Sequence, residues 1–278
     1  MYADNLQIYL HVHHNNANYA IERLNEDLTS IFKWANKFGL KLNPEKSQVI
    51  VMGHHRLLSV LNTLPPVKIN DNIVEYCETV KNLGIFMDND LNWNSQVTHT
   101  CKKIFSLLHV LKHLNDFLPF TLKKTLIQTL VMPHFDYCDT LLTNLSSNLA
   151  ERLQRVHNVC VRFICNTKKF DHVTPSFQLL SWVRLKERRM IHSLLLFFKI
   201  FSTSTPKYLV SRFQFLTSLR NQHQLLVSIP QHRTSLYSSS FTVEIPRLWN
   251  SLPSEVRNCR TLPQFKMKLE SFVNMKSC

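Results

Sequence analysis

The residues at the amino end place one carboxylate directly before an apolar run. Asp4 lies between Ala3 and Asn5, and residues 6–12 then alternate apolar and polar side chains. A carboxylate in the turn before a strand is a candidate ligand for a hard cation such as Mg²⁺, which prefers oxygen ligands. Phosphoryl transfer often uses two such ions about 3.5–4 Å apart. Asp4 is therefore a candidate metal ligand whose chemistry requires a second acid.

The tetrapeptide Tyr2-Ala3-Asp4-Asn5 resembles the Tyr/Phe-Ala-Asp-Asp box of reverse transcriptases, and further motifs follow it in order. These motifs are Gly-Leu-Lys-Leu-Asn-Pro-Glu-Lys-Ser at 39–47, Leu83-Gly84-Ile85 with Asp88, Leu91 and Trp93, Leu-Gln-Arg-Val-His-Asn at 153–158, Pro-Lys-Tyr-Leu at 206–209, and Pro-Arg-Leu-Trp-Asn-Ser-Leu-Pro at 246–253. They resemble, in turn, the next palm motif, the primer-grip region and the tail of non-LTR (LINE, jockey-like) retrotransposon reverse transcriptases. The resemblance covers nearly the whole chain and implies an RNA-directed DNA polymerase.

This resemblance implies a role for four residues. Asp4 would hold a catalytic Mg²⁺, and Lys46 would assist at the incoming triphosphate, where a cation stabilises the leaving pyrophosphate. Leu83 and Gly84 would position the primer end. The alternative for Asp4 is an ordinary turn carboxylate, and the alternative for Lys46 is a solvated lysine at the start of a strand.

Two departures from the family pattern predict that this chain alone does not polymerise DNA. Asn5 replaces the second acid of the box, and a neutral amide is a poorer metal ligand than a carboxylate. In the family, another metal-binding aspartate lies on an earlier palm strand, whereas this sequence begins at the box. We therefore expect an inactive polymerase fragment in which Mg²⁺ binding is ancestral. A non-enzymatic nucleic-acid-binding module and a gene-model fragment without its own function remain open alternatives.

The formal net charge of +14 is concentrated in the carboxyl-terminal part. Residues 1–100 hold 8 Lys and Arg against 10 Asp and Glu, and residues 101–278 hold 25 against 9. Such an excess attracts phosphate backbones without base specificity, although anionic membranes or acidic partners would be attracted nearly as well. We expect nucleic acid as the partner, either an RNA template, a DNA primer or a duplex. A solvated surface is the alternative for the basic residues of the predicted helices, which are Lys102, Lys103, Lys112, Lys123, Lys124, Arg152, Arg155, Arg162, Lys168, Lys169, Arg184, Lys186, Arg188 and Arg189.

Composition excludes several other classes. With three glycines and no Walker or Rossmann pattern, no small-molecule cofactor is evident, and no Ser-His-Asp or Cys-His spacing supports a hydrolase. Seven scattered cysteines without a Cys-x-x-Cys pair predict a reducing compartment, nuclear or cytoplasmic, rather than secretion. The most apolar run, 191–201, is interrupted by His192 and Lys199 and is shorter than the roughly 20 residues of a membrane span.

Other histidines, cysteines and aromatic residues are weaker candidates. His11 and His13 would share one side of a strand as metal ligands do, but no acid or cysteine completes their set. A zinc set of His157, Cys160, Cys165 and His172 competes with the simpler interpretation of buried thiols on an apolar helix. Core positions are expected, rather than base-stacking platforms, for the three aromatic residues Phe120, Trp182 and Trp249.

Periodicity predicts an α+β fold. We expect a partial reverse-transcriptase palm at 1–95, with a small antiparallel sheet and a helix on one face, a basic helical thumb-like region at 96–201, and a tail at 202–278. The predicted strands are 6–12, 46–52, 67–69, 73–76 and 80–87, and the predicted helices are 17–38, 97–117, 119–131, 147–164, 185–201 and 263–275. Residues 235–240 are expected to form a loop.

Overall fold

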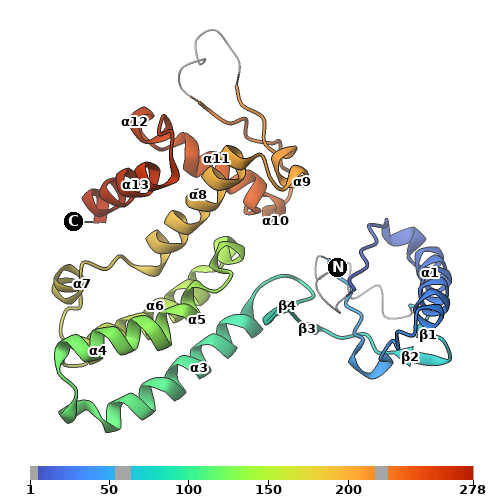
Figure 1. Cartoon of the computed structure of the whole chain (residues 1–278), viewed down its shortest axis with the longest axis horizontal. Helices are drawn as coiled ribbons and strands as arrows, with labels where there is room; N and C mark the ends of the chain where they lie inside the picture. The colour runs from blue at the N-terminus through green and yellow to red at the C-terminus, as the bar shows by residue number, and fades with distance from the viewer. Residues whose placement is uncertain (1–5, 54–63, 217–224, 278) are drawn as a thin grey trace. The chain divides into compact units, whose positions relative to one another are not determined.

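The structure is a computed structural model that describes residues 6–53, 64–216 and 225–277. The chain divides into two compact units, Met1–Gln96 and Val97–Cys278, coloured from blue to red along the chain in Figure 1. Helices dominate, and two small antiparallel sheets accompany them, so the predicted α+β class is confirmed. The division between the units lies one residue beyond the predicted end of the first region.

The described residues of the first unit contain one long helix. The helix α1 (Ala17–Lys37) follows the 3-10 turn η1 (His14–Asn16), as the apolar spacing of the sequence predicted. Gly39 follows its last turn with a φ of +69°, a conformation that glycine adopts without strain. Asn25 anchors the helix because its side chain accepts from the backbone N–H of Lys68 at 2.9 Å and donates to the carbonyl of Pro66 at 3.1 Å.

Two antiparallel hairpins complete the first unit. The predicted strands 67–69 and 73–76 are confirmed, with a shift at the second, as the hairpin of β1 (Val67–Ile69) and β2 (Asn72–Val74). The predicted single strand 80–87 is wrong, because it forms a second hairpin, β3 (Thr79–Asn82) and β4 (Ile85–Asp88). The chain reverses at Leu83 and Gly84, whose φ values are +47° and +88°. Two consecutive positive φ angles match the twist of the strands that such a turn connects.

The two other predicted strands of the first unit do not form. Residues 6–12 are exposed and contain no strand, and the segment 46–52 contributes one bridge, between Val49 and Tyr76. Residues Pro44–Lys46 instead form the 3-10 turn η2. A strand requires a neighbouring chain to satisfy its backbone groups, and periodicity alone does not supply one.

The second unit is helical. Its elements are α3 (Asn94–His113), η4 (Asn115–Phe117), α4 (Phe120–Leu126), the π-helical turn η5 (Ile127–Val131), α5 (Met132–Asp136), η6 (Asp139–Asn144), α6 (Ser147–Cys165), α7 (Thr174–Leu180), α8 (Leu185–Thr203), α9 (Lys207–Val210), α10 (Ser235–Ser238), α11 (Phe241–Asn250), α12 (Ser254–Arg257) and α13 (Leu262–Ser277). All five predicted helices of this region are present. The expected loop at 235–240 is wrong at its start, because Thr234 caps α10 by accepting from the backbone N–H of Tyr237 at 3.2 Å.

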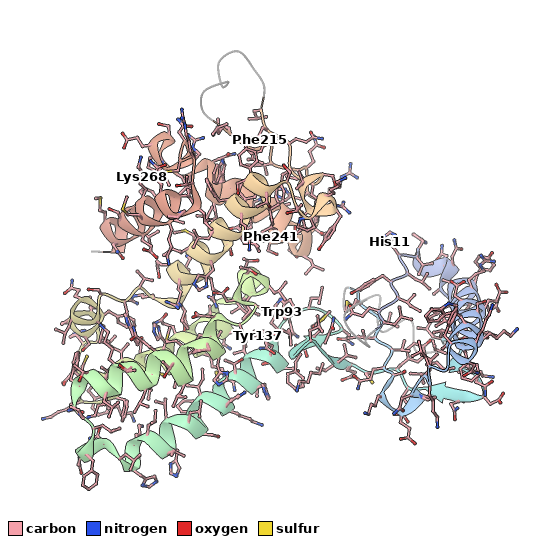
Figure 2. The ribbon with its side chains drawn as sticks, in the orientation of Figure 1. His11, Trp93, Tyr137, Phe215, Phe241 and Lys268 are labelled. Atoms are coloured by element: carbon pink, nitrogen blue, oxygen red, sulfur yellow. The ribbon has the colours of Figure 1, made fainter. Side chains whose placement is uncertain are left out.

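Two apolar clusters stabilise the second unit. The first joins α3, η5, α6 and α7, and the second joins α8, α11 and α13. Phe215 and Phe241, labelled in Figure 2, pack against the second cluster. The helix α8 contributes Leu185 to the first cluster and Leu194 and Phe197 to the second. The predicted tail at 202–278 is therefore packed onto α8 within the same compact unit.

Candidate nucleic-acid interface

The helix α3 presents lysines on the side opposite its buried face. Its buried positions recur every three or four residues and are Val97, Cys101, Ile104, Leu108 and Leu111. Lys102 and Lys103 are exposed between them. Burial lowers the pKa of His134 in α5, and the nearby Lys103 and His99 lower it further. Lys102 and Lys103 therefore place two exposed positive charges on this part of unit 2.

Two arginines of α6 have different surroundings. Arg152 is half-buried and donates from Nη1 to Thr98 Oγ1 at 2.9 Å, which ties α6 to α3. Arg155 is exposed and forms a 3.3 Å ion pair with Glu151, one helical turn away. Because both partners of this pair are exposed, solvent weakens the interaction and leaves Arg155 accessible to a phosphate.

Lys123 is buried and is not part of the predicted nucleic-acid-binding surface. Its exposed fraction is 2%. Its Nζ donates to Asn115 Oδ1 at 2.8 Å and to Asn166 Oδ1 at 2.7 Å, and lies 5.4 Å from the ring centroid of Phe163. A buried ammonium is tolerated because these amide oxygens and the aromatic ring replace water. Lys123 holds helices together rather than presenting its charge to a ligand.

Arg188 is also neutralised within the protein. Its Nε and Nη2 donate to the two carboxylate oxygens of Asp136 at 2.5 and 2.6 Å. This hydrogen bonding raises the pKa of Arg188. Burial lowers the pKa of the neighbouring Arg189, although Asp139 and Glu187 oppose that shift. We therefore remove Arg188 from the candidate interface, and Arg189 is at most partly accessible there.

The remaining predicted cations lie around the carboxyl end of α6. Lys168 and Lys169 are exposed in the loop after this helix, and Lys124 of α4 is half-buried. Arg162 is half-buried and donates from Nη2 to the backbone carbonyl of Asp171 at 3.2 Å, so that it supports the same loop. The accessible members of the predicted set on α3, α4, α6 and the loop after α6 therefore include Lys102, Lys103, Lys124, Arg155, Lys168 and Lys169, and the predicted Lys112, Arg184 and Lys186 are exposed as well.

The sequence analysis missed a cluster formed by Asp136, Asp139 and His192. Among the described residues it is the only His/Cys/Asp/Glu group with ligand atoms close enough to share a metal ion. His192 Nδ1 and Asp139 Oδ2 lie 2.6 Å apart, and burial raises the pKa of Asp139. Arg188 already occupies both oxygens of Asp136, so a dication would have to displace a bidentate ion pair. No local signal predicts the cluster, because 53 residues separate Asp139 from His192.

The predicted catalytic and primer-positioning residues belong to the first unit. Asp4 lies outside the described residues. Lys46 ends η2 and is exposed, and the side chain of Asn43 accepts from its backbone N–H at 3.4 Å. Leu83 and Gly84 are exposed at the tip of the β3–β4 hairpin. The predicted triphosphate contact therefore lies on η2, and the predicted primer contacts lie on the β3–β4 hairpin.

The alternative zinc set around His157 is a buried core. His157 is fully buried, and its ring lies 5.5, 5.1 and 5.8 Å from those of Phe135, Phe177 and Trp182. Burial lowers the pKa of His157 to about 3 and raises that of Cys160 to about 12. The interpretation as apolar packing is confirmed for these two residues.

The core prediction is confirmed for two of the three aromatic residues Phe120, Trp182 and Trp249 and is wrong for the third. Trp182 packs against the first cluster and Trp249 is fully buried, as predicted. The core prediction for Phe120 is wrong, because 42% of this residue is exposed at the start of α4. His11, labelled in Figure 2, and His13 lie outside any strand, so the strand geometry that would align two metal ligands does not apply to them.

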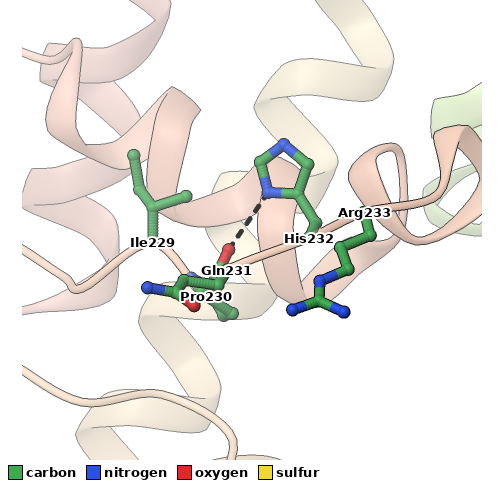
Figure 3. A pocket seen from close by; sticks show the side chains of 5 residues that line it. All are labelled: Ile229, Pro230, Gln231, His232 and Arg233. Carbon is green, nitrogen blue, oxygen red and sulfur yellow. Dashed lines mark hydrogen bonds between the residues drawn. The ribbon is translucent and has the colours of Figure 1, made fainter.

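A surface hollow in the second unit lacks the converging groups of a ligand-binding site. It is lined by the consecutive residues 229–233, drawn in Figure 3. His232 Nδ1 lies 3.1 Å from the carbonyl of Pro230, and its Nε2 lies 2.8 Å from Arg247 Nη2. Because one short stretch supplies the whole lining, no groups from separate elements converge there as they do in a built ligand site.

Comparison of the chain with protein-family models, with curated proteins and with solved structures gave no match. None of the described helices combines the length and the apolar character needed to cross a bilayer. The functional assignment therefore depends on the residues themselves.

Proposed function

We propose that this chain is the nucleic-acid-binding rear part of a reverse transcriptase of the non-LTR retrotransposon kind, and that by itself it binds nucleic acid without polymerising it. The observation that supports binding is a group of accessible cations on α3, α4, α6 and the loop after α6, which we call the basic set. It consists of Lys102, Lys103, Lys124, Arg155, Lys168 and Lys169. The order of the palm-like and tail-like sequence motifs supports the polymerase origin.

The charge balance of unit 2 favours a polyanionic ligand. Its 25 Lys and Arg outnumber 9 Asp and Glu, and an excess of cations remains because each ion pair, such as Asp136 with Arg188 or Glu151 with Arg155, uses one charge of each sign. Phosphate contacts by such cations release counterions and give affinity without base specificity. The proposed ligand is therefore a template–primer duplex or a similar nucleic acid, recognised through its backbone.

The proposed lack of polymerisation depends on the residues beside Asp4. Two-metal phosphoryl transfer requires carboxylates on both ions, and the neighbour of Asp4 is the amide Asn5. Mg²⁺ is accordingly an ancestral cofactor in this proposal, with Asp4 as its remaining ligand. Lys46, Leu83 and Gly84 would retain the positions of triphosphate and primer contacts without completing a catalytic centre.

Binding of a blunt 20-base-pair duplex, measured by fluorescence anisotropy over a range of salt concentrations, tests this proposal. We expect log-linear weakening with salt, and the double variant Lys102→Gln/Lys103→Gln should reduce the slope by about 1.8, since each lost phosphate contact contributes about 0.9. Lys33→Gln, at an exposed position of α1 to which no ligand contact is assigned, is the matched control and should leave the slope unchanged. A salt-independent affinity would contradict backbone recognition.

Primer extension on an RNA template with Mg²⁺ or Mn²⁺ tests the second half of the proposal. We expect no product from the wild-type chain at any enzyme concentration that saturates the template. Product that disappears in the Asp4→Ala variant would show that this chain assembles a catalytic centre, and the proposal of an inactive fragment would be wrong.

A further inference from the structure

One end of the helices in unit 2 exposes aromatic rings among lysines. Phe117 ends η4, Phe120 begins α4, and Phe170 lies in the loop after α6. Their exposed fractions are 83%, 42% and 90%. Phenylalanine is among the residues most often buried in folded proteins, so neighbouring exposed rings indicate a binding surface.

The buried Lys123 brings these rings to the same end. Its Nζ donates to Asn115 and to Asn166, so that the turn η4 and the end of α6 are direct neighbours. Phe117 lies two residues beyond Asn115, and Phe170 lies four residues beyond Asn166. We call the surface that they form the aromatic end, and its members are Phe117, Phe120, Lys168, Lys169 and Phe170.

The loop of the aromatic end is held by its own hydrogen bonds. Asp171 Oδ2 accepts from the backbone N–H of Lys168 at 3.0 Å, and Arg162 donates to the carbonyl of Asp171. Lys169 Nζ lies 5.5 Å from the ring centroid of Phe170. A cation and a ring are thus presented together on an ordered loop, which reduces the entropy lost when a ligand binds.

We infer that the aromatic end binds single-stranded nucleic acid, with the rings of Phe117 and Phe170 stacking on unpaired bases and with Lys168 and Lys169 contacting phosphates. Proteins that bind single strands combine a cationic path for the backbone with aromatic rings for successive bases. The inference rests on the proposed function and specifies a second ligand class for it. The basic residues of α3 contact duplex backbone, whereas the aromatic end takes the unpaired strand.

The chemistry around the rings favours bases over a membrane. Asp116 precedes Phe117 and Asp171 follows Phe170, so that a carboxylate adjoins each of these two rings. Insertion into a bilayer requires a continuous apolar face, and the acids and lysines next to these rings in the sequence interrupt such a face. Stacking requires only one open face of each ring, and the neighbouring lysines supply the charge that phosphates need.

Binding of fluorescein-labelled (dT)12 to the full chain, measured by anisotropy, tests the inference. We expect the double variant Phe117→Leu/Phe170→Leu to lose tenfold or more in affinity for (dT)12, since a stacking contact contributes about tenfold per base. Its affinity for the blunt 20-base-pair duplex should be unchanged. The variant Phe117→Trp/Phe170→Trp keeps the rings and should retain (dT)12 binding. Tyr208→Leu removes an aromatic side chain from α9 that is 71% exposed and is the matched control.

The outcomes separate this inference from the proposed function. If the wild-type chain binds the duplex but the leucine double variant binds (dT)12 as the wild type does, the aromatic end is not a single-strand site and the proposed function stands. If neither nucleic acid binds, both are wrong. Binding to phosphatidylserine vesicles that is lost in the leucine double variant, with (dT)12 binding intact, would assign the aromatic end to membranes instead.

Discussion

The two units of the chain differ in how their apolar residues are used. In unit 2, apolar side chains from helices far apart in the sequence meet in two buried clusters. In the described part of unit 1, the buried apolar residues are spread over α1 and the two hairpins, while Tyr9, Trp34 and Phe38 are exposed by 78%, 53% and 61%. The difference indicates that the stability of the chain resides mainly in unit 2.

The two units also differ in charge. Unit 2 has a net charge of +16 and unit 1 has a net charge of −2. Two-stranded hairpins are at best marginally stable in water, whereas packed helices position exposed side chains firmly. The unit with the stronger core is therefore also the one that displays the cations, as backbone recognition of a polyanion requires.

The largest expected effect comes from comparing the buried Trp249 of unit 2 with the exposed Trp34 of unit 1. Trp249 is fully buried, lies 5.1 Å from the ring of Phe197, and donates from Nε1 to the carbonyl of Leu225 at 2.7 Å. We expect Trp249→Ala to lower the free energy of unfolding by about 3–5 kcal/mol, because it leaves a cavity and an unsatisfied carbonyl. Trp34→Ala in unit 1 should cost less than about 1 kcal/mol. Urea unfolding followed by circular dichroism measures both, and equal losses would contradict the comparison.

A smaller effect is the pH dependence that His157 gives to unit 2. Its pKa is about 3 in the folded protein and near 6.5 in the unfolded chain. Below pH 6.5 the unfolded chain therefore binds a proton that the folded protein does not, and stability present above that pH is lost as pH falls towards 3. Between pH 7 and pH 5 the loss should be about 2 kcal/mol. His157→Leu should flatten this dependence in urea unfolding, and an unchanged pH profile would refute the assignment.

The smallest expected effect is the loss of stability on removing the buried Lys123, and it distinguishes this residue from the surface lysines. Lys123→Met removes the donor that joins Asn115 and Asn166, and we expect a loss of about 1–2 kcal/mol in unfolding free energy. The slope of duplex affinity against salt should not change, because the Lys123 ammonium does not reach the ligand. Lys33→Met, at an exposed position of unit 1, should alter neither quantity. A reduced salt slope for Lys123→Met would return this residue to the interface.

Local patterns predicted the helices well and the sheet poorly. The spacing of apolar residues specified α1, α6 and α8, because a helix satisfies its backbone groups within its own segment. The run 80–87 has strand composition throughout, yet it folds back at Leu83 and Gly84. Strand pairing depends on a neighbouring chain, so composition alone did not show where each strand would end.

For the candidate site, the sequence shows that the carboxyl-terminal part is basic. It does not show which of the cations are exposed and which are buried or paired within the protein. Lys102 and Lys103 alternate with the buried positions of α3, and their exposure follows from helical geometry. The pairing of Arg188 with Asp136 spans 52 residues, and no local feature distinguishes Arg188 from the exposed Lys186. The exposure of Phe120 was missed because an aromatic residue at a helix start is ordinarily a core residue.

The amino-acid sequence by itself determined the division of charge between the two units and the positions of the long helices, because both depend on residues that are close together along the chain. The tertiary structure alone decided which cations remain accessible and which rings stay outside the core. Lys123 became buried because Asn166, 43 residues away, supplies one of its two oxygen acceptors. That same contact joins the turn of Phe117 to the loop of Phe170 and so creates the aromatic end.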